Sequence, residues 1–370
     1  MSKVIVVNAG SASLKVGVLD DGNAVTGSLE LDPWDGRSDH PELADFLRCH
    51  GSGSILGHRV VHGGSRFTGP VILDDSALAG IRALTSLAPL HQPRAIAAIE
   101  AGRQVLPDAP AVACFDTSFH ATLPDVAARY ALPADWNGKF GLRRYGFHGL
   151  SHEYASRRAA ELVGHDITGL RIVSCHLGGG GSLAAVSGGR SVDTTMGFTP
   201  LEGLVMATRS GSVDPGLLLW LLQQDKVSLE ELSAGLEQRA GLAGLAGLPT
   251  GSGDLRDVRA AADAGDRAAQ LAIDVYVHRL RREIAAMAAA MNGLDVLVFT
   301  GGIGEHHPRV RADTTAGLAF LGVRLDATRN TAATSDTEIG DPDGPVRTLV
   351  VTAREDLEIA RQAREVAASS

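Results

Sequence analysis

Positive charge is scarce in this chain of 370 residues: 34 lysines and arginines stand against 43 aspartates and glutamates, and the formal net charge is −9. A broad surface for nucleic acid or for an anionic membrane is therefore not expected. Any arginines that bind an acidic substrate must be few and specifically placed. At this length two domains are expected, because one core rarely fills so long a chain.

Cysteine is also scarce. Cys49, Cys114 and Cys175 lie far apart and form no CxxC pair, so neither a disulfide framework nor a cysteine-rich zinc site is expected, and a reducing, cytoplasmic location is favoured. Long hydrophobic runs are missing as well. Residues 4–7 are too short for the core of a signal peptide, and residues 217–222 are too short to cross a bilayer. We therefore expect a soluble protein that is not exported.

Several common motifs are absent. The only Gly-Lys pair is followed by Phe140, so no P-loop is present, and His307 occupies the last place of a would-be GxGxxG, which disfavours a dinucleotide fold. A GxSxG elbow is missing too. His148 and His152 are four residues apart, but HExxH would need a histidine where Ser156 stands, so a zinc site is not expected.

Three glycine-rich turns follow short apolar runs. Strands are expected at 171–176 and 182–186 around the turn 178–181, and at 4–7 and 14–19 around the turn 8–13. A third strand, 294–300, leads into a GGxG turn and a helix start. Each turn alone could be a flexible hairpin, but bare backbone amides also bind phosphate, and a GGxG turn can hold a ribose and a base. Three such turns without a P-loop favour an actin-like sugar-kinase architecture, with two domains built on one plan.

The remaining patterns give a coarse outline. Asp116 follows an expected strand at 111–115, at the strand end where ligands bind in α/β sheets, although an acid there is often only a cap. The long alanine-rich stretch 258–292 is expected to form two helices broken near Gly265, and 240–253 is expected to be a surface loop. Residues 22–57 are poorly patterned.

Nine sequence blocks, in order along the chain, resemble those of the acetate kinase family. They read NAGSASLK at 8–15, HRVVHGG at 58–64, FDTSFH at 115–120, YGFHGLSH at 145–152, HLGGGGS at 176–182, TPLEGLVMATRSGSVDPG at 199–216, GDLRD at 253–257, FTGGIGE at 299–305 and TAREDLEIA at 352–360. The resemblance therefore covers the chain from end to end.

This resemblance implies an α/β fold of two actin-like (ribonuclease H-like) domains, each a mixed five-stranded sheet with flanking helices, and an active site in the interdomain cleft. The domains are expected at 1–149 with 356–370, and at 150–355, the latter carrying the adenosine site. The implied reaction is reversible phosphoryl transfer from ATP to acetate, giving acetyl phosphate and ADP, with Mg²⁺ (Mn²⁺ is possible), in a homodimer. Such a reaction needs placed cations, donors and a metal rather than a nucleophile.

The same blocks imply roles for individual residues. Arg59 and Arg209 resemble the two arginines that hold the carboxylate and the phosphoryl group, for which a planar fork is suited. His148, with Arg209, is expected to stabilise the transition state. Asp116 resembles the acid that orients an arginine or the reacting groups, and it is no general base, because acetate is already ionised at pH 7. The pocket for the acetate methyl corresponds to Val61, Leu90, Phe147 and Pro200, with His91 more peripheral.

Nucleotide and metal contacts are implied in the same way. The expected nucleotide-binding residues are Ser11, Ser13, Lys15, His176, Leu177, Gly178, Gly179, Gly180, Asp254, Leu255, Arg256, Gly301, Gly302, Ile303 and Gly304. His176 is also expected to line the phosphoryl path. Asn8 and Glu355 are the expected metal residues, a sparse set that suits Mg²⁺ because this ion usually keeps several waters.

The chain departs from the family pattern in three places. Gly179 stands where the family usually has asparagine, which removes a side-chain donor and bears on nucleotide affinity or preference. His306 replaces a second asparagine after the GGxG turn, which bears on adenine recognition. The segment between residues 22 and 57 is shorter than usual.

Three alternatives remain open. A propionate or butyrate kinase would share the fold and chemistry, since each CH₂ changes discrimination by only about 1–3 kcal/mol. A non-catalytic actin-like ATPase switch would need no arginines for an acid substrate. A phosphatase of the same superfamily would release phosphate without depending on acetate.

Overall fold

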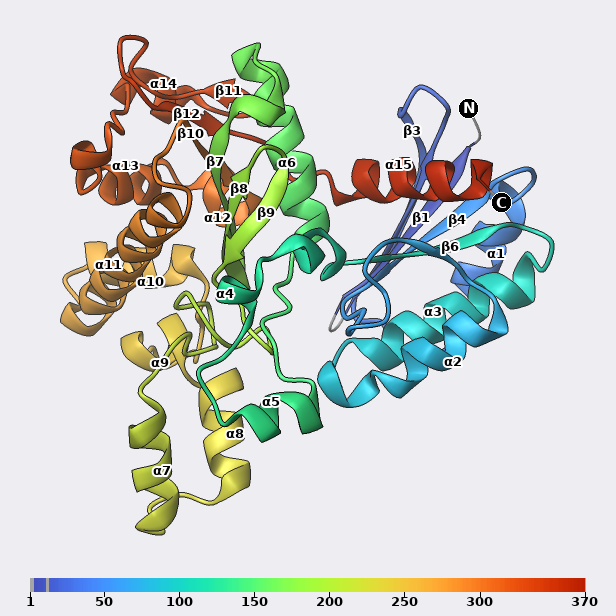
Figure 1. The fold of residues 1–370 in the computed structure, drawn as a ribbon, viewed down its shortest axis with the longest axis horizontal. Coiled ribbons are helices and arrows are strands. Elements are labelled where there is room, and N and C mark those ends of the chain that lie inside the picture. Colours follow the sequence, from blue (N-terminus) through green and yellow to red (C-terminus); the bar gives the residue numbers. More distant parts are fainter. Residues whose placement is uncertain (1–2, 11–12, 370) are drawn as a thin grey trace. The chain divides into compact units, whose positions relative to one another are not determined.

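The computed structural model describes residues 3–10 and 13–369, and the chain forms two compact units (Figure 1). Unit 1 comprises Met1–Ala121, Phe147–Tyr154 and Arg354–Ser370, and unit 2 comprises Thr122–Gly146 and Ala155–Ala353. The predicted domain division stays a prediction. The units differ from it chiefly in residues 122–146, which cluster with unit 2.

Unit 1 is built on a six-stranded mixed sheet in the order β3-β2-β1-β4-β6-β5. Its strands are β1 (Val4–Ala9), β2 (Leu14–Leu19), β3 (Val25–Leu31), β4 (Ile55–Val60), β5 (Val71–Ile72) and β6 (Ala111–Phe115). The central strands β1, β4 and β6 run parallel, whereas β2, β3 and β5 pair antiparallel with their neighbours. Parallel central strands place their carboxyl ends at one edge of the sheet.

Both faces of this sheet are covered, so β1 reads as a continuous apolar run. Ile5 and Val7 belong to the core shared with α1 (Pro41–His50), α2 (Asp75–Ala83) and α3 (Gln92–Val105). Val4 and Val6 face the other way and pack in a cluster with Ile359 of α15 (Glu355–Ala368). The last helix of the chain therefore completes the core of unit 1.

Unit 2 contains a second six-stranded sheet, in the order β11-β12-β10-β7-β8-β9. Its strands are β7 (Arg171–Leu177), β8 (Gly181–Ser187), β9 (Arg190–Thr194), β10 (Val296–Thr300), β11 (Thr337–Glu338) and β12 (Arg347–Val350). Its largest core packs β7, β8 and β10 against the long helix α11 (Arg267–Ala290), through residues such as Val173, Phe299 and Tyr276.

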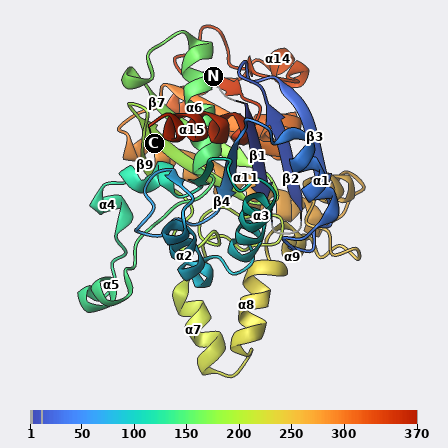
Figure 2. The same ribbon diagram turned by 90° about the vertical axis from the view of Figure 1, so that its right-hand side faces the viewer.

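The other helices are shorter. They are α4 (Asp125–Ala128), α5 (Ala134–Phe140), α6 (Gly149–Val163), α7 (Pro215–Gln223), α8 (Leu229–Gln238), α9 (Gly241–Ala246), α10 (Leu255–Asp263), α12 (Gly301–His306), α13 (Pro308–Ala316) and α14 (Ala327–Ala332). Four 3₁₀ segments lie at Thr85–Leu87, Ser118–Thr122, Ile167–Gly169 and Ala319–Leu321. Helices α7 and α8 lie side by side in both views of Figures 1 and 2 and project from the rest of unit 2.

The two sheets share one strand plan. Each begins with three consecutive antiparallel strands, continues with two parallel strands, and ends with a two-residue antiparallel strand, β5 or β11. The predicted mixed α/β fold is confirmed. The predicted count of five strands in each sheet is wrong, because the short edge strand makes six. The repeated strand–turn–strand pattern seen in the sequence corresponds to β1-β2 and β7-β8.

Most local predictions are confirmed. The strands expected around the three glycine turns are present, and Gly265, with φ of +97°, separates α10 from α11. The predicted surface loop at 240–253 is wrong in part. Leu242 and Ala246 are buried in the unit 2 core and give this stretch a short helix, α9. Among the described residues, no helix has both the length and the apolar character needed to cross a membrane.

Candidate functional site

Polar side chains lie where the parallel strands of unit 1 end. Asn8 is near the end of β1, Arg59 near the end of β4, and Asp116 directly after β6. Arg59 donates from Nε and Nη2 to the two carboxylate oxygens of Asp116, at 2.9 and 2.6 Å. Its Nη1 donates to Oδ1 of Asn8 at 3.1 Å. The sheet topology thus brings together residues 8, 59 and 116.

Glu355 joins this group from the first position of α15. Nδ2 of Asn8 donates to Oε2 of Glu355 at 3.3 Å, and Nη1 of Arg59 lies 3.9 Å from the same oxygen. We call Asn8, Arg59, Asp116 and Glu355 the unit 1 cluster. Its two carboxylates outnumber its one guanidinium, so it favours the approach of a cation.

Burial acts on the charges of this cluster. Burial opposes the charge of Arg59, but the carboxylates of Asp116 and Glu355 outweigh that effect and raise the pKa of its guanidinium. Burial also raises the pKa of the Asp116 carboxyl, while the adjacent guanidinium of Arg59 works against the rise. The bidentate geometry fixes the plane of Arg59, because both of its edges are engaged.

His148 is placed by a close backbone approach. The N–H of Gly149 donates to the carbonyl oxygen of Asp116 at 2.9 Å, and a Cβ at position 149 would lie only 2.2 Å from that oxygen. Only glycine therefore allows α6 to begin here. His148, directly before it, has φ of +56°, a left-handed conformation that is uncommon outside glycine. The chain thus holds His148 next to the backbone of Asp116.

The predicted pocket for an acetate methyl is divided between the units. Val61 and Phe147 are buried in unit 1, whereas Leu90 is 55% exposed. Pro200 lies in unit 2, where its carbonyl oxygen accepts a hydrogen bond from Arg209. His91 directly precedes α3. Of the four predicted pocket residues, only Val61 and Phe147 are both apolar and buried.

Unit 2 contains a pocket of about 530 Å³ beside the turn between β7 and β8 and the start of α12. It is lined by Gly178, Gly179, Ala207, Thr208, Gly253, Asp254, Leu255, Arg256, Gly302, Ile303, His306 and His307. Seven of these twelve are predicted nucleotide residues. Thr208 and His307 also line the pocket, although the sequence did not predict them as nucleotide-binding residues. His307 directly follows His306, one of the positions that depart from the family pattern.

The other predicted nucleotide residues lie elsewhere. His176, Leu177, Gly180, Gly301 and Gly304 belong to the same turns and strands but do not line this pocket. Ser13 and Lys15 belong to unit 1, where the exposed ammonium group of Lys15 forms an ion pair with Glu30 at 3.1 Å. Ser11 lies outside the described residues.

Backbone packing gives the pocket its shape. Ala207 N–H donates to the carbonyl oxygen of Gly179 at 3.1 Å, which ties one loop to the glycine turn. A Cβ at Gly253 would lie 2.1 Å from the carbonyl oxygen of Ala207, so a side chain is excluded there. At Gly179, by contrast, a Cβ would meet no atom within 4 Å. Position 179 can therefore accept a side chain that this protein lacks.

Charged groups on the pocket wall are already paired. Asp254 accepts the N–H of Arg256 at 2.8 Å as the N-cap of α10 and also pairs with its guanidinium. Hydrogen bonds from the side chain and the backbone of Arg256 lower the pKa of Asp254 to about 2. Burial lowers the pKa of His307, which keeps its ring neutral near pH 7. The pocket thus offers glycine amides, the neutral ring of His307 and one neutralised ion pair.

Among the described residues, Arg209 forms hydrogen bonds only to neutral groups, and the more distant carboxylate of Glu237 offsets only part of the effect of burial on its pKa. Its Nη1 donates to the carbonyl oxygen of Pro200 at 3.1 Å and lies 3.7 Å from the sulfur of Met206. Burial lowers the pKa of its guanidinium, and none of the ion pairs among the described residues includes it. A half-buried cation without a carboxylate partner is suited to bind an anion from solution.

Comparisons with known proteins agree with the motifs. Residues 47–361 match the model of the acetokinase family. The acetate kinase of Shouchella clausii is 42% identical over an alignment that covers 98% of each chain. The crystal structure of Porphyromonas gingivalis acetate kinase has a TM-score of 0.89 at 35% identity, covering 99% of this chain and 100% of that one. A propionate kinase from Francisella tularensis has a TM-score of 0.90, also at 35% identity, over 99% and 100% of the chains. The chain belongs to the acetokinase family.

Proposed function

We propose that this protein is an acetate kinase, which transfers the γ-phosphoryl group of ATP reversibly to acetate and forms acetyl phosphate and ADP. The observation that carries this proposal is the unit 1 cluster, in which an arginine forms a bidentate pair with one carboxylate and lies near a second, at the carboxyl ends of the parallel strands. Full-length similarity to acetate kinases supports the same activity. The reaction moves a phosphoryl group between anions, so placed cations are its main requirement.

The two arginines and His148 would act on the reacting groups. Arg209, whose hydrogen-bond partners are neutral, can donate to a carboxylate or phosphoryl oxygen without giving up a bonded protein carboxylate. Arg59 is fixed in its plane by Asp116, so it can present a remaining N–H without reorganising. His148 would donate a ring N–H to the transferring group. Positioning of this kind can lower a barrier by on the order of 7–11 kcal/mol.

The unit 2 pocket is the proposed nucleotide site. Its volume of about 530 Å³ is within the usual range of about 300–1,000 Å³ for small-molecule sites. Backbone amides of the turn at Gly178 and Gly179 would bind phosphate oxygens, while Ile303 and His306 would pack beside the base and ribose. His176, on β7 beside this turn, is proposed to line the phosphoryl path.

Asn8 and Glu355 fit a Mg²⁺ ion by their chemistry. Both present oxygen atoms, which Mg²⁺ prefers, and they are already hydrogen-bonded to each other. Among the described residues no group of three or more His, Cys, Asp or Glu side chains could hold a metal, so these two would bind it together with water and phosphate oxygens. When bound, the ion would neutralise the charge of the nucleotide phosphates.

The test is an acetate-dependent hydroxamate assay with ATP and Mg²⁺. We expect activity in the unchanged protein and a loss of about 100-fold or more in Arg59→Ala and Glu355→Ala, because each removes a charge placed at the reacting groups. Arg239→Ala is the control, since Arg239 is an exposed arginine that bonds only the carbonyl oxygen of Glu231. ATP hydrolysis without acetate dependence would favour an ATPase switch or a phosphatase instead.

Propionate is the second candidate substrate, because the similar structure from Francisella tularensis is a propionate kinase. Val61 and Phe147 are the buried apolar residues that would contact the alkyl group. Comparing kcat/KM for acetate, propionate and butyrate distinguishes the two. A higher value for propionate than for acetate would replace the first proposal.

A homodimer and a cytoplasmic location stay predictions. Helix α7 supports the first of them, because none of its residues is buried although it is strongly apolar. Leu217, Leu219 and Trp220 are 47%, 56% and 52% exposed, and a second copy of the chain would cover them. Sedimentation should show a dimer for the unchanged protein and for Lys226→Glu but a monomer for Trp220→Glu.

A further inference from the structure

Arg311 is a buried arginine outside the residues discussed so far. It lies in α13, is only 1% exposed, and is among the largest fully buried side chains of the chain. No ion pair among the described residues includes it, and burial lowers its pKa to about 10. A buried cation of this kind destabilises a fold unless its hydrogen bonds are well satisfied.

Among the described residues, this guanidinium donates only to neutral oxygen atoms, two on α12 and two on Asn330 of α14. Nη1 donates to the carbonyl oxygens of Gly304 and Glu305 at 2.8 and 2.7 Å. These are carbonyls near the end of α12, where a helix leaves its last acceptors without internal partners. Nε and Nη2 donate to Oδ1 and to the carbonyl oxygen of Asn330, at 2.8 and 2.7 Å.

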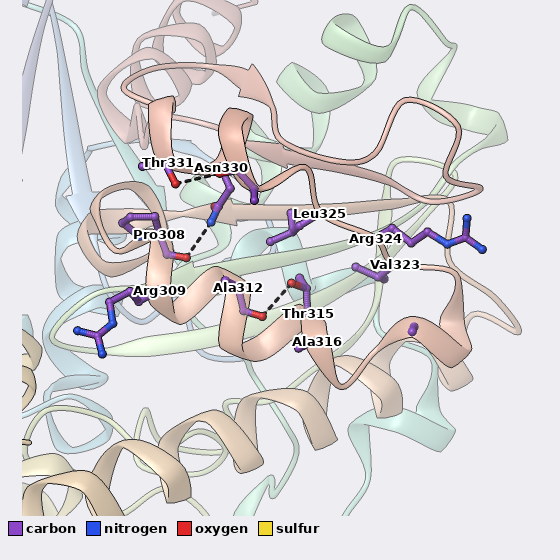
Figure 3. A pocket seen from close by; sticks show the side chains of 12 residues that line it. Pro308, Arg309, Ala312, Thr315, Ala316, Val323, Arg324, Leu325, Asn330 and Thr331 are labelled. Atoms are coloured by element: carbon purple, nitrogen blue, oxygen red, sulfur yellow. Dashed lines mark hydrogen bonds between the residues drawn. The ribbon is translucent and has the colours of Figure 1, made fainter.

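Asn330 extends this connection to a third segment. Its Nδ2 donates to the carbonyl oxygen of Pro308 at 2.9 Å, and Figure 3 shows this bond on the wall of a cavity of about 550 Å³. One guanidinium and one amide therefore join the end of α12, the start of α13 and helix α14. Both polar side chains are nearly inaccessible to water.

Helix α12 is the element that these bonds hold, and it lines the unit 2 pocket. Gly302, Ile303 and His306 belong to it, and His307 follows it directly. A helix of six residues has little stability of its own, so its position depends on such contacts. A second contact, from the N–H of Ala353 to Oε1 of Glu305 at 2.9 Å, holds the same end.

We propose that Arg311, together with Asn330, is a positioning residue for the nucleotide: it fixes the end of α12 and thereby the pocket wall formed by Gly302, Ile303 and His306. This inference rests on the proposed function, because it takes the pocket to be the nucleotide site. Stability alone would not require a cation, since an apolar side chain of similar length could fill the same volume without desolvation of a charge.

The experiment measures the KM values for ATP and acetate and the Kd for ADP in Arg311→Lys, Arg311→Met and Asn330→Asp. We expect the KM for ATP and the Kd for ADP to rise about tenfold or more in the Arg311 variants. Methionine leaves the carbonyl oxygens of α12 without a donor, and the single ammonium nitrogen of lysine cannot reproduce the planar fork that bonds α12 and Asn330 together. Asn330→Asp, which keeps an acceptor for Arg311 but loses the donor to Pro308, should show a smaller rise. The KM for acetate should stay within about twofold, since acetate does not contact α12 in the proposed scheme.

Two controls separate positioning from general destabilisation. Arg171→Met removes a similar set of bonds, to Asp295 and to the carbonyl oxygen of Asn292, at the opposite end of β7. It should lower the Tm without changing the ratio of the two KM values. Thr331→Ala lies on the same cavity wall as Asn330 and loses only a bond to the carbonyl oxygen of Ala327, so it should leave both KM values unchanged.

The outcomes are distinct. If the unchanged protein neither binds ADP nor forms acetyl phosphate, the proposed function is wrong. If it does both and a folded Arg311→Lys or Asn330→Asp variant keeps its affinity for ADP, the positioning role is wrong. A parallel rise of the KM for ATP and for acetate in these variants and in Arg171→Met would also overturn it.

Discussion

Arg59 in unit 1 and Arg209 in unit 2 are held in opposite ways. Arg59 is engaged on both edges by Asp116 and Asn8 and lies near a second carboxylate, whereas Arg209 bonds a carbonyl oxygen and lies near a sulfur atom. Correspondingly, the pKa of Arg59 is raised because neighbouring carboxylates outweigh its burial, while burial lowers that of Arg209.

This difference in partners suits the two arginines to different roles. An arginine that is already paired is rigid and gains little from a further anion, so it is suited to orient groups. An unpaired, half-buried arginine gains a partner when an anion binds, so it is suited to take up charge as the charge develops. The comparison predicts that a change at Arg209 affects chemistry most, and that a change around Arg59 affects both chemistry and stability.

The largest expected effect is that of Arg209→Ala. We expect kcat for acetyl phosphate formation to fall by about 10³-fold or more, as for other arginines that neutralise a transferring phosphoryl group. The Tm should change little, because no ion pair is broken. Arg209→Lys should recover only part of the rate, because an ammonium lacks the planar fork. If the kcat of Arg209→Ala stayed near that of the unchanged protein, Arg209 would not bind the developing charge, and the proposed difference in role between Arg209 and Arg59 would be wrong.

Asp116→Asn should come next, with a fall of about 100-fold in kcat/KM because Arg59 loses its bidentate partner. Unlike the change at Arg209, it should also lower the free energy of unfolding by about 3 kcal/mol, since the buried Arg59 loses its bonded carboxylate and keeps only the more distant Glu355. Asp295→Asn is the control, because it breaks an ion pair with Arg171 that is about one-third exposed and should cost less than about 1 kcal/mol. Urea unfolding and steady-state kinetics measure both quantities.

A third prediction concerns His58, the neighbour of Arg59 on β4. His58 is fully buried, neither ring nitrogen has a hydrogen-bond partner among the described residues, and burial lowers its pKa to about 4. The unfolded chain binds a proton below about pH 6.5, whereas the folded protein does so only near pH 4. Stability should therefore fall as the pH drops through this window, by about 2 kcal/mol at pH 5 from this group alone.

His58→Leu should remove this part of the pH dependence, which urea unfolding at pH 7 and pH 5 will measure. His278→Gln, an exposed histidine of α11, should leave the pH dependence as it is. An equal loss of stability at pH 5 in His58→Leu and in the unchanged protein would show that burial at this position does not govern the titration.

The smallest expected effect is that of Gly179→Asn in unit 2. The new side chain enters open space beside the proposed phosphate turn and adds one amide donor. We expect the KM for ATP to fall about threefold, in line with one additional neutral hydrogen bond. Gly138→Asn is the control, because a Cβ there also meets no atom within 4 Å but lies outside the pocket. An unchanged or higher KM for ATP would argue against phosphate binding at this turn.

The sequence predicted β1, β2, β6, β7, β8 and β10, because each is a short apolar run that ends in glycine or a polar turn, but it did not predict the parallel strands β4 and β12. It also placed Asn8 and Asp116 at the ends of strands, whereas Arg59 came only from the resemblance to the family, because no strand was predicted where β4 lies. The edge strands β5 and β11 could not be predicted, because two residues carry no periodicity. Each of these edge strands forms only because a neighbouring strand, β6 or β12, supplies its backbone hydrogen-bond partners.

Two further features depend on tertiary structure. Residues 240–253 are so rich in glycine, with a proline at position 249, that local propensity favours a loop, yet burial of Leu242 and Ala246 stabilises a helix there. Arg311 gave no signal because it stands in a polar stretch beside other arginines. Its partners in α12 and α14 become neighbours only in the folded chain.

The return of α15 to the sheet of unit 1 has a consequence for synthesis on the ribosome. Val4, Val6 and Val112 share their cluster with Ile359 and Ala363, so one face of the first sheet stays uncovered until α15 has been translated. Unit 2 lies entirely before α15 in the chain and can fold earlier. Because Glu355 begins this helix, the unit 1 cluster is completed only after the whole of unit 2 has been synthesised, and until then a nascent chain lacks one of its proposed metal residues.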